Sequence, residues 1–214
     1  NSTALMSNIN YFRKSMKFLY IVGDIASESA FKASSTYLQS QFEKAAQVAK
    51  EINIDGFLVD FEPSGSSSSL AQEYTSFLHS FQQVLSKDGI GIGCDIADWG
   101  ILDYFSDYAT ADLNVYTSMT PTYYGKNLQQ DKNYVIEELK YFKPATLRTG
   151  IGSMCSANSD WNYEWTQSSL TNFLNFLKYN VSVPSVDIWR ADIDYSTDST
   201  EKWFYQCLED FTKN

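Results

Sequence analysis

Two carboxylic acids at the end of a short apolar segment are the residues of this sequence best suited to chemistry. Residues 55–62 predict a β-strand, along which successive side chains alternate between two faces. One face of that strand is apolar: Phe57, Val59 and Phe61. The other face carries Leu58, Asp60 and Glu62. Because a charge buried without partners is costly, we expect the carboxylate face to line a cavity and the apolar face to pack on helices.

A proton donor next to a second carboxylate suits glycoside hydrolysis. That reaction needs an acid for the leaving oxygen and a group that stabilises positive charge at the anomeric carbon. Glu62 stands at the carboxyl end of the predicted strand and is the candidate acid. The negative charge of Asp60, two residues earlier, would favour the protonated form of Glu62 near neutral pH. The alternative is a buried, hydrogen-bonded pair without activity.

The elements that must position this pair alternate along the chain, which predicts an α/β fold with a parallel sheet. Apolar runs predict strands at residues 17–23, 55–62, 89–97, 113–120, 147–154 and 186–191. Helical spacing of apolar residues predicts helices at 37–50, 74–85, 135–142, 170–177 and 203–211. The serine-rich segment 64–69 predicts a flexible loop directly after the carboxylate strand.

The carboxylate strand resembles the Asp-Gly-x-Asp-x-Asp-x-Glu signature of glycoside hydrolase family 18, the chitinases and their non-catalytic relatives. Asp55, Gly56, Asp60 and Glu62 match in register, and Leu58 replaces the middle Asp. The resemblance implies a TIM barrel of (β/α)8 type and no cofactor or metal. It also implies that the N-acetyl group of the substrate is the nucleophile. Asp60 would orient that acetamide, and Glu62 would act as acid and then as base.

Other parts of the resemblance concern sugar binding. Trp189, followed by acidic residues, resembles the tryptophan that forms the floor of the subsite next to the cleaved bond, although a strand tryptophan can equally be core. The sixth strand of the family carries Met-x-Tyr-Asp. Here Met119 has no such tyrosine, and Tyr116 or Tyr123 is the candidate substitute. Val22, Gly23 and Asp24 end the third strand in place of Ser-x-Gly-Gly.

Further residues are expected at the mouth of the barrel, where loops after the strands build sites. Asp98 and Trp99 follow the fifth strand, and Trp161, Tyr163 and Trp165 follow the seventh, where they line a sugar groove or cover the barrel. If Asp60 and Glu62 instead belong to an unrelated barrel hydrolase, a second acid such as Asp95 or Asp98 must lie about 5 Å or 6.5–9.5 Å away.

The chain shows only six strand–helix units, which the resemblance places as barrel strands three to eight. We therefore expect residues 1–214 to be one partial TIM-barrel domain. Roughly 60 more residues would complete such a barrel, since TIM barrels typically have about 250. A second chain or a missing N-terminal segment would supply the first two strands. A six-stranded open sheet is the alternative, and it would leave two exposed edges.

Charge and composition limit the partners. A formal net charge of −10 disfavours nucleic acid and anionic membrane surfaces. No run of about 20 apolar residues is present to span a bilayer. The triplets beginning at Asn1 and Asn180 are glycosylation sequons, weak support for a secreted or lumenal glycoprotein. Cys94, Cys155 and Cys207 allow one disulfide and one thiol, or three thiols. No spacing typical of a zinc site occurs.

The sequence therefore predicts a secreted, family 18-like glycoside hydrolase of chitinase or endo-β-N-acetylglucosaminidase type. Its substrates would be β-linked N-acetylglucosamine glycans, cleaved with retention and with assistance from the substrate. The alternative is a non-catalytic, chitinase-like protein that binds carbohydrate or has a structural role, with a degenerate site. Both alternatives keep Trp189, whereas only the enzyme needs Asp60 and Glu62 in one open pocket.

Overall fold

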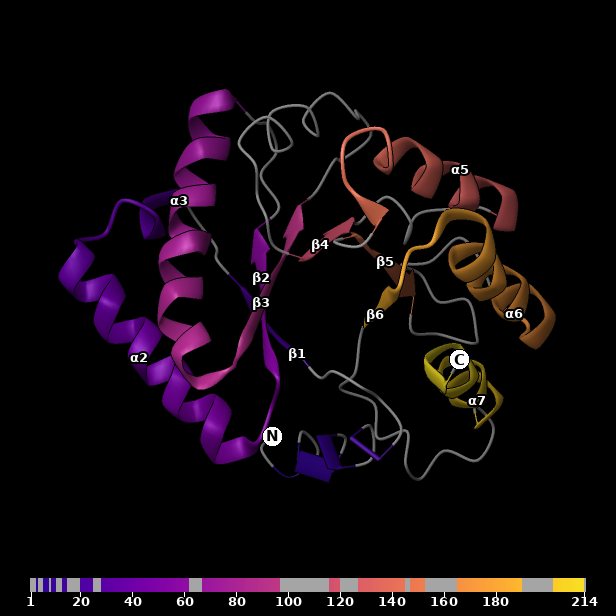
Figure 1. The fold of residues 1–214 in the computed structure, drawn as a ribbon, viewed down its shortest axis with the longest axis horizontal. Coiled ribbons are helices and arrows are strands. Elements are labelled where there is room, and N and C mark those ends of the chain that lie inside the picture. The colour runs from indigo at the N-terminus through magenta and orange to yellow at the C-terminus, as the bar shows by residue number, and fades with distance from the viewer. Residues whose placement is uncertain are drawn as a thin grey trace. The chain divides into compact units, whose positions relative to one another are not determined.

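The computed structural model describes most of the predicted elements (Figure 1). It covers residues 20–24, 28–61, 67–96, 116–119, 127–144, 147–152, 165–189 and 202–213, and isolated positions between 3 and 14. Within β1, β4 and β5, and at the ends of β3 and β6, only the backbone is described. The chain forms two compact units, one of residues 18–118 and one of residues 1–17 with 119–214. The single domain over residues 1–214 stays a prediction.

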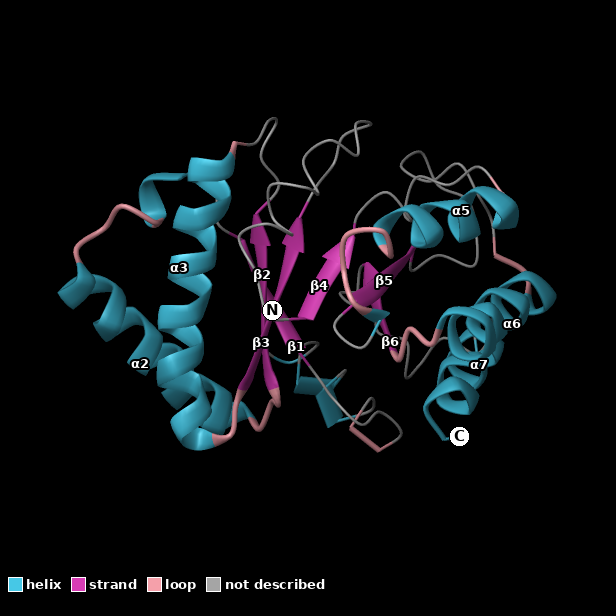
Figure 2. Ribbon diagram, turned by 45° about the horizontal axis from the view of Figure 1, so that its top comes forward, coloured by secondary structure: helices cyan, strands magenta, loops and turns pink. Residues whose placement is uncertain are grey.

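The unit of residues 18–118 has a parallel sheet with a helix in each crossover. Its strands are β1 (Tyr20–Asp24), β2 (Gly56–Phe61), β3 (Gly91–Ile96) and all but the last residue of β4 (Tyr116–Met119), and neighbours in the sheet follow chain order. The pairs β1–β2 and β2–β3 are parallel. Helix α2 (Ser35–Ile52) connects β1 to β2, and α3 (Ser68–Leu85) connects β2 to β3 (Figure 2). Short 3-10 turns, η1 (Glu28–Ala30) and η2 (Ser86–Asp88), adjoin these helices.

Helix α2 has clear local start and stop signals. The Ser34 hydroxyl accepts a hydrogen bond from the backbone N–H of Tyr37 at 3.3 Å, which satisfies one of the free donors of the first turn. The helix ends at Asn53, which adopts φ 56°, a left-handed conformation that asparagine tolerates better than most residues. Its buried residues, Phe42, Ala46 and Ala49, recur at helical spacing and face the interior of the unit.

Aromatic rings join α2 to α3 in the core of this unit. Phe42 of α2 stacks on Phe81 of α3 with ring centroids 4.5 Å apart and meets Phe77 edge-on at 5.3 Å. Phe31, in the turn before α2, lies 5.2 Å from Phe77. Ring pairs at these separations stabilise a core beyond the area that they bury. The cluster fixes both helices on the same side of the sheet.

Tyr74 of α3 is fully buried and ties the helix to the carboxylate strand. Its hydroxyl donates a hydrogen bond to the backbone carbonyl of Val59 at 3.1 Å.

We expect Tyr74→Phe to lower the free energy of unfolding by about 1 kcal/mol, because the buried carbonyl loses this donor. Urea unfolding of the variant and of the wild type measures the difference. Tyr37→Phe is the control, since Tyr37 is 57% exposed, and an equal loss in both variants would contradict the role of Tyr74.

The second unit has its own parallel strand pair and a layer of helices. Strand β5 (Leu147–Gly152) pairs with β6 (Ser185–Trp189). The helices are α5 (Leu128–Glu138), α6 (Gln167–Asn175), which continues into the π-helical segment η5 (Phe176–Val181), and α7 (Lys202–Lys213). Thr166 and Ser169 form a reciprocal capping box at the start of α6.

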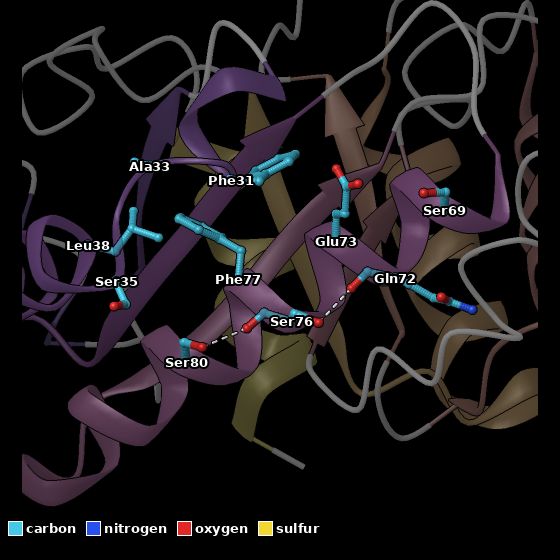
Figure 3. A pocket seen from close by; sticks show the side chains of 10 residues that line it. All are labelled: Phe31, Ala33, Ser35, Leu38, Ser69, Gln72, Glu73, Ser76, Phe77 and Ser80. Atoms are coloured by element: carbon cyan, nitrogen blue, oxygen red, sulfur yellow. Dashed lines mark hydrogen bonds between the residues drawn. The ribbon is translucent and has the colours of Figure 1, made fainter.

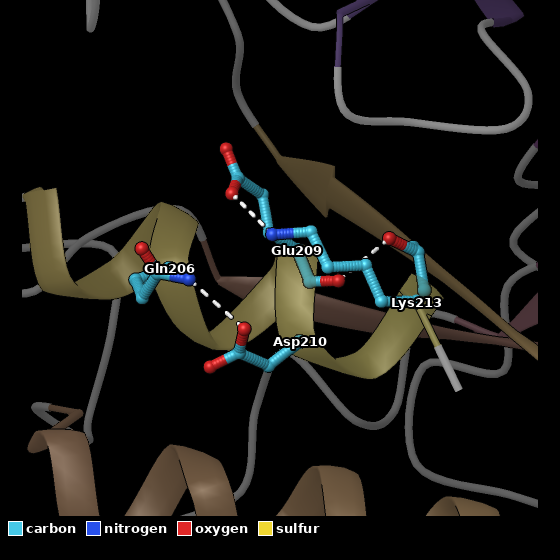
Figure 4. Close-up of polar contacts among 5 residues, drawn as sticks. Gln206, Glu209, Asp210 and Lys213 are labelled. Atoms are coloured by element: carbon cyan, nitrogen blue, oxygen red, sulfur yellow. Dashed lines mark hydrogen bonds and ion pairs between the residues drawn. The ribbon is translucent and has the colours of Figure 1, made fainter.

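Helix α7 is amphipathic. Phe204, Cys207 and Leu208 are buried, and Cys207 lies 3.5 Å from the Thr171 hydroxyl of α6. Its outer side carries contacts at i,i+4 spacing (Figure 4). There Lys213 pairs with Glu209 at 3.1 Å, and the Gln206 amide donates to Asp210 at 2.9 Å. Exposed pairs of this kind contribute only about 0.3–0.5 kcal/mol each, so the buried face holds the helix in place.

The predicted elements agree with the described ones in order and type. Three differences have physical causes. Helix α3 begins at Ser68, ahead of the predicted start at residue 74, because the Ser67 hydroxyl accepts a hydrogen bond from the Leu70 N–H at 3.2 Å and caps the helix there; Ser68 and Ser69 therefore belong to the helix and not to the predicted loop. Helix α5 ends at Glu138 instead of reaching Phe142, because Leu139 already adopts the cap position; Phe142 is buried in the turn that follows. The helix predicted up to residue 177 continues as η5 to Val181, since the backbone shifts to a wider helical turn. No helix among the described residues is long and apolar enough to cross a bilayer.

Candidate functional site

The apolar face of β2 packs on helix α3, as the alternation of its side chains predicts. The Phe57 ring stacks on Phe81 at 5.9 Å. Phe61 lies 5.1 Å from Tyr74 and meets Phe31 edge-on at 4.7 Å. These contacts confirm that Phe57 and Phe61 face the helices. Because side chains alternate along a strand, Leu58 and Asp60 belong to the opposite face of the sheet.

On that opposite face, Asp60 stands in a row of three aspartates from neighbouring parallel strands. Asp24 of β1 and Asp95 of β3 occupy the register positions on either side of Asp60. Residues at one register position of a parallel sheet share a face, and neighbouring strands lie about 4.8 Å apart. Asp24 ends β1, and Asp60 and Asp95 are each the last residue but one of their strands. Three acidic residues therefore share one register position near the carboxyl edge of the sheet.

Asp24 is a member of this row that motif matching passes over. In the sequence, Asp24 stands out only as part of a departure from Ser-x-Gly-Gly, and Asp95 only as a possible second acid of an unrelated hydrolase. Asp24 and Asp95 are identified as neighbours of Asp60 by the pairing register of β1, β2 and β3, because these strands do not share one sequence pattern. Asp60 is half-buried, whereas Leu58, on the same face, is 3% exposed.

The row below the aspartates is apolar. Leu58 is level with Val22 of β1 and with Gly93 of β3. A carboxylate at position 58, as the family signature requires, would therefore stand between an aliphatic residue and a glycine, neither of which offers a side-chain hydrogen bond. The leucine is thus consistent with its neighbours, and the three aspartates occupy the register position two residues nearer the carboxyl ends of the strands.

The remaining candidates are only partly described. Glu62, Asp98, Trp99 and Tyr123 lie outside the described residues, as do Trp161 and Tyr163. Tyr116 is the first residue of β4, so it lies at the amino end of that strand. Trp189 is the last residue of β6, in register with Gly152 of β5, and so lies at the carboxyl end expected of a residue at the barrel mouth. Asp60 belongs to one unit and Trp189 to the other.

Trp165 and the described cysteines are buried. Trp165 is 5% exposed and lies 5.5 Å from Phe173, so it covers the apolar core and does not line a groove. Cys94 and Cys207 are buried thiols, so neither belongs to a disulfide; Cys155 lies outside the described residues. Among the side chains that the structure describes, no three His, Cys, Asp or Glu residues are grouped as metal ligands would be.

A shallow pocket of about 490 Å³ lies on the helix side of the first unit, between α3 and the segment that leads into α2 (Figure 3). Phe31, Leu38 and Phe77 give it apolar walls, and serines of both helices surround them. The Ser76 and Ser80 hydroxyls donate to backbone carbonyls one turn earlier, so their protons are already used within the helix. None of the candidate catalytic residues lines this pocket.

No sequence model of a protein family matches the chain, and no curated protein matches it. Solved structures do match in fold. A class V chitinase from Pseudomonas fluorescens Pf-5 has a TM-score of 0.61 at 10% identity, over 96% of this chain and 84% of that one. The catalytic domain of a family GH18 chitinase from a fern, Peteris ryukyuensis, has a TM-score of 0.59 at 14% identity, over 90% and 68%.

A third match is a mutant of catalytic domain 2 of the group II chitinase from Ostrinia furnacalis, solved with a chitooligosaccharide. Its TM-score is 0.56 at 9% identity, over 91% of this chain and 75% of that one. At sequence identities this low, the matches show similarity of fold alone. The chain therefore has an α/β fold similar to that of chitinase catalytic domains.

Proposed function

We propose that this chain is a family 18-like glycoside hydrolase that cleaves β-linked N-acetylglucosamine glycans with retention of configuration. Glu62 donates a proton to the leaving oxygen and then activates water as a base. Asp60 orients the acetamide of the substrate, whose carbonyl oxygen attacks the anomeric carbon, and stabilises the positive charge of the resulting ring. Trp189 stacks on the sugar next to the cleaved bond.

One observation carries this proposal: Asp60 stands near the carboxyl edge of a parallel sheet, on the face opposite the helices, in a chitinase-like fold. In a TIM barrel, that face is the interior and that edge is the mouth, where active sites lie. The packing of Phe57 and Phe61 on the helix side supports the register on which this placement depends. Glu62, two residues after Asp60, would continue on the same face.

The proposed mechanism and the fold matches both support this substrate class. A nucleophile supplied by the substrate requires an N-acetyl group on the sugar. A solved chitinase domain of similar fold was crystallised with a chitooligosaccharide, which fits a glycan ligand of this kind. Chitin fragments and the chitobiose core of N-glycans both present β-linked N-acetylglucosamine.

The test compares two oligosaccharides of equal length. One is a chitin oligomer, and the other is the same oligomer with its acetyl groups removed. The proposal predicts cleavage of the N-acetylated oligomer alone, because the free amine cannot act as the nucleophile. Chromatography of the products measures both reactions. Equal cleavage of the two oligomers would contradict participation of the substrate and favour two ordinary carboxylates.

A non-catalytic carbohydrate-binding protein is the second candidate, and Leu58 favours it. The structure places this residue between Val22 and Gly93, with no carboxylate at the level that the family signature requires. The binding protein predicts affinity for chitin oligomers without turnover. In that case Trp189→Ala would lower affinity by removing stacking area, whereas Glu62→Gln would leave it unchanged.

The aspartate row offers carboxylates in place of the one that is absent at Leu58. Asp24 and Asp95 occupy the register positions on either side of Asp60, and we propose that one of them assists Asp60 by sharing a proton or a hydrogen bond with it. We expect Asp24→Asn to slow hydrolysis about tenfold, the equivalent of one hydrogen bond to a charged group, ~1.5 kcal/mol.

The measurement for Asp24→Asn is kcat/KM on a chitin oligomer, with Asp88→Asn as the matched control. Asp88 lies in η2, at the opposite end of the sheet, where it pairs with Lys50 at 3.0 Å. Unchanged kinetics in Asp24→Asn would show that the row does not assist Asp60.

The proposal includes a complete (β/α)8 barrel. The two further strands come from a preceding segment or a second chain, because six strands of this type would need an unusual tilt to close. It also includes an extracellular or lumenal location, where such polymers occur. Light scattering of the chain, alone and with any preceding segment, tests the first point. Detection of the chain outside or inside its cells tests the second.

A further inference from the structure

The sequon at Asn180 lies at the end of helical segment η5, on the surface of the second unit. Residues 180–182 read Asn-Val-Ser, the acceptor pattern for N-linked glycans, in which any residue except proline is allowed in the middle. Both Asn180 and Ser182 are exposed. The side chains that a glycosyltransferase must recognise are therefore accessible, and so is the space that an attached sugar would occupy.

Hydrogen bonds to a buried residue hold the backbone at this site. Ser182 adopts φ 58° and ends η5, and its N–H donates to the carbonyl of Leu177. The N–H of Val183 donates to the same carbonyl at 2.9 Å. Leu177 and Val183 are both fully buried. The turn thus holds Asn180 at a fixed surface position, where an attached glycan displaces no core residue.

An exposed aromatic ring stands next to the acceptor. Tyr179 is 69% exposed, more than any other large apolar side chain that the structure describes. Lys178 Nζ lies 5.7 Å from the centroid of the Tyr179 ring. The same nitrogen donates a hydrogen bond to the Phe211 carbonyl of α7 at 3.3 Å. A sugar linked to Asn180 can cover this ring with its apolar face, as sugars do on aromatic side chains in binding sites. The exposed ring of Tyr179 thus offers an attached glycan an apolar surface for packing.

We propose that Asn180 is an N-glycosylation site. The Asn180 Nδ2 atom forms a bond to C1 of the first N-acetylglucosamine of an oligosaccharide carried on a polyprenyl pyrophosphate. The bond from C1 to the pyrophosphate oxygen breaks, the polyprenyl pyrophosphate leaves with the electron pair, and Nδ2 loses one proton. The inference uses neither Asp60 nor Glu62, so it stands or falls independently of the proposed hydrolase activity.

The experiment expresses the chain, behind a cleavable leader, in a eukaryotic cell. Asn1→Gln is present throughout, because Asn1 begins the other sequon of the sequence. Protein from the medium and from the secretory lumen is treated with peptide N-glycosidase in heavy-oxygen water, which marks a formerly glycosylated asparagine as labelled aspartate. We expect mass spectrometry to find the label at residue 180. Unlabelled Asn180 in the pooled protein would overturn the proposal.

Two variants make the test specific. Asn180→Gln removes the acceptor nitrogen with little change of polarity. Ser182→Gly removes the required hydroxyl and favours the turn, because glycine adopts positive φ without strain. Both are expected to lose the glycan while thermal melting shows a folded chain. Retention of the label in Ser182→Gly would overturn the assignment to the sequon.

Tyr179→Ala tests the packing of the sugar. We expect enzymatic removal of the glycan to lower the melting temperature of the parent chain more than that of Tyr179→Ala. Equal shifts in the two chains would overturn the role given to the ring, while the label at residue 180 reports the modification itself.

Discussion

The Glu62→Gln chain is expected to lose hydrolysis of a chitin oligosaccharide by about 100- to 10,000-fold, the usual contribution of a general acid–base group. The amide keeps the shape of the carboxyl and its capacity to accept a hydrogen bond, but it cannot donate a proton to the leaving oxygen. The fold should persist, because the substitution is isosteric and falls directly after β2 in the sequence. Single-turnover kinetics on a labelled oligomer measure the loss.

The matched control is Glu73→Gln on helix α3. Glu73 lines the shallow pocket on the helix side and lies 3.8 Å from Lys32, so it is a carboxylate remote from the face of Asp60. Its replacement should leave the rate within experimental error. A Glu62→Gln chain as active as this control would refute the role of Glu62 and with it the proposed mechanism.

The second large effect concerns stability and pH, through the buried residue Asp131 of α5. This side chain is 1% exposed, and neither carboxylate oxygen has a hydrogen-bond partner among the described residues. Burial raises the pKa of Asp131 from 3.8 to about 7. Below pH 3.8 the carboxyl is neutral in both folded and unfolded chains, so its ionisation costs nothing.

Between pH 3.8 and about 7 the unfolded chain ionises Asp131 while the folded chain keeps the proton. Stability therefore falls as pH rises through this range, by up to about 4 kcal/mol in total, and levels off above it. Asp131→Asn should remove this fall, so that the variant becomes progressively more stable than the wild type as pH increases. Urea unfolding at pH values between 4 and 8 measures both curves.

Asn133→Asp is the converse control on the same helix. Asn133 is exposed and accepts a hydrogen bond from the Gln129 amide at 3.0 Å, which an aspartate can equally accept. A carboxylate there stays solvated, and its introduction should not steepen the dependence on pH. Parallel curves for the wild type and Asp131→Asn would show that Asp131 does not stay protonated in the folded chain.

Much of the fold was predictable because its signals are local. The alternation of Phe57, Leu58, Val59 and Asp60 specified both faces of β2, and the contacts of Phe57 with Phe81 confirm the assignment. Helix spacing placed α2 and α6 within a few residues of their actual bounds, whereas the start of α3 at Ser68 was missed because the serines of its first turn carry no apolar signal. The end of α5 was not predicted, because Phe142 continues the apolar spacing even though the backbone leaves the helix at Leu139.

The candidate site was predictable only where a motif marks it. Asp60 stands out through its signature, whereas Asp24 does not, since its neighbours do not match the family pattern. Its place beside Asp60 depends on the pairing of β1 with β2, whose residues are 36 positions apart (60 minus 24), and no local pattern reports such a pairing. The burial of Trp165 could likewise not be predicted, because a tryptophan after a strand suits a sugar groove and a core equally well.

The most direct test of the central claim is the configuration of the first product released from a chitin oligosaccharide. Proton magnetic resonance during the first minutes of the reaction distinguishes the two anomers before they equilibrate. Retaining hydrolysis through Glu62 and the acetamide of the substrate predicts the β-anomer. The α-anomer would contradict this mechanism, and binding of the oligomer without any product would contradict the assignment of an enzyme.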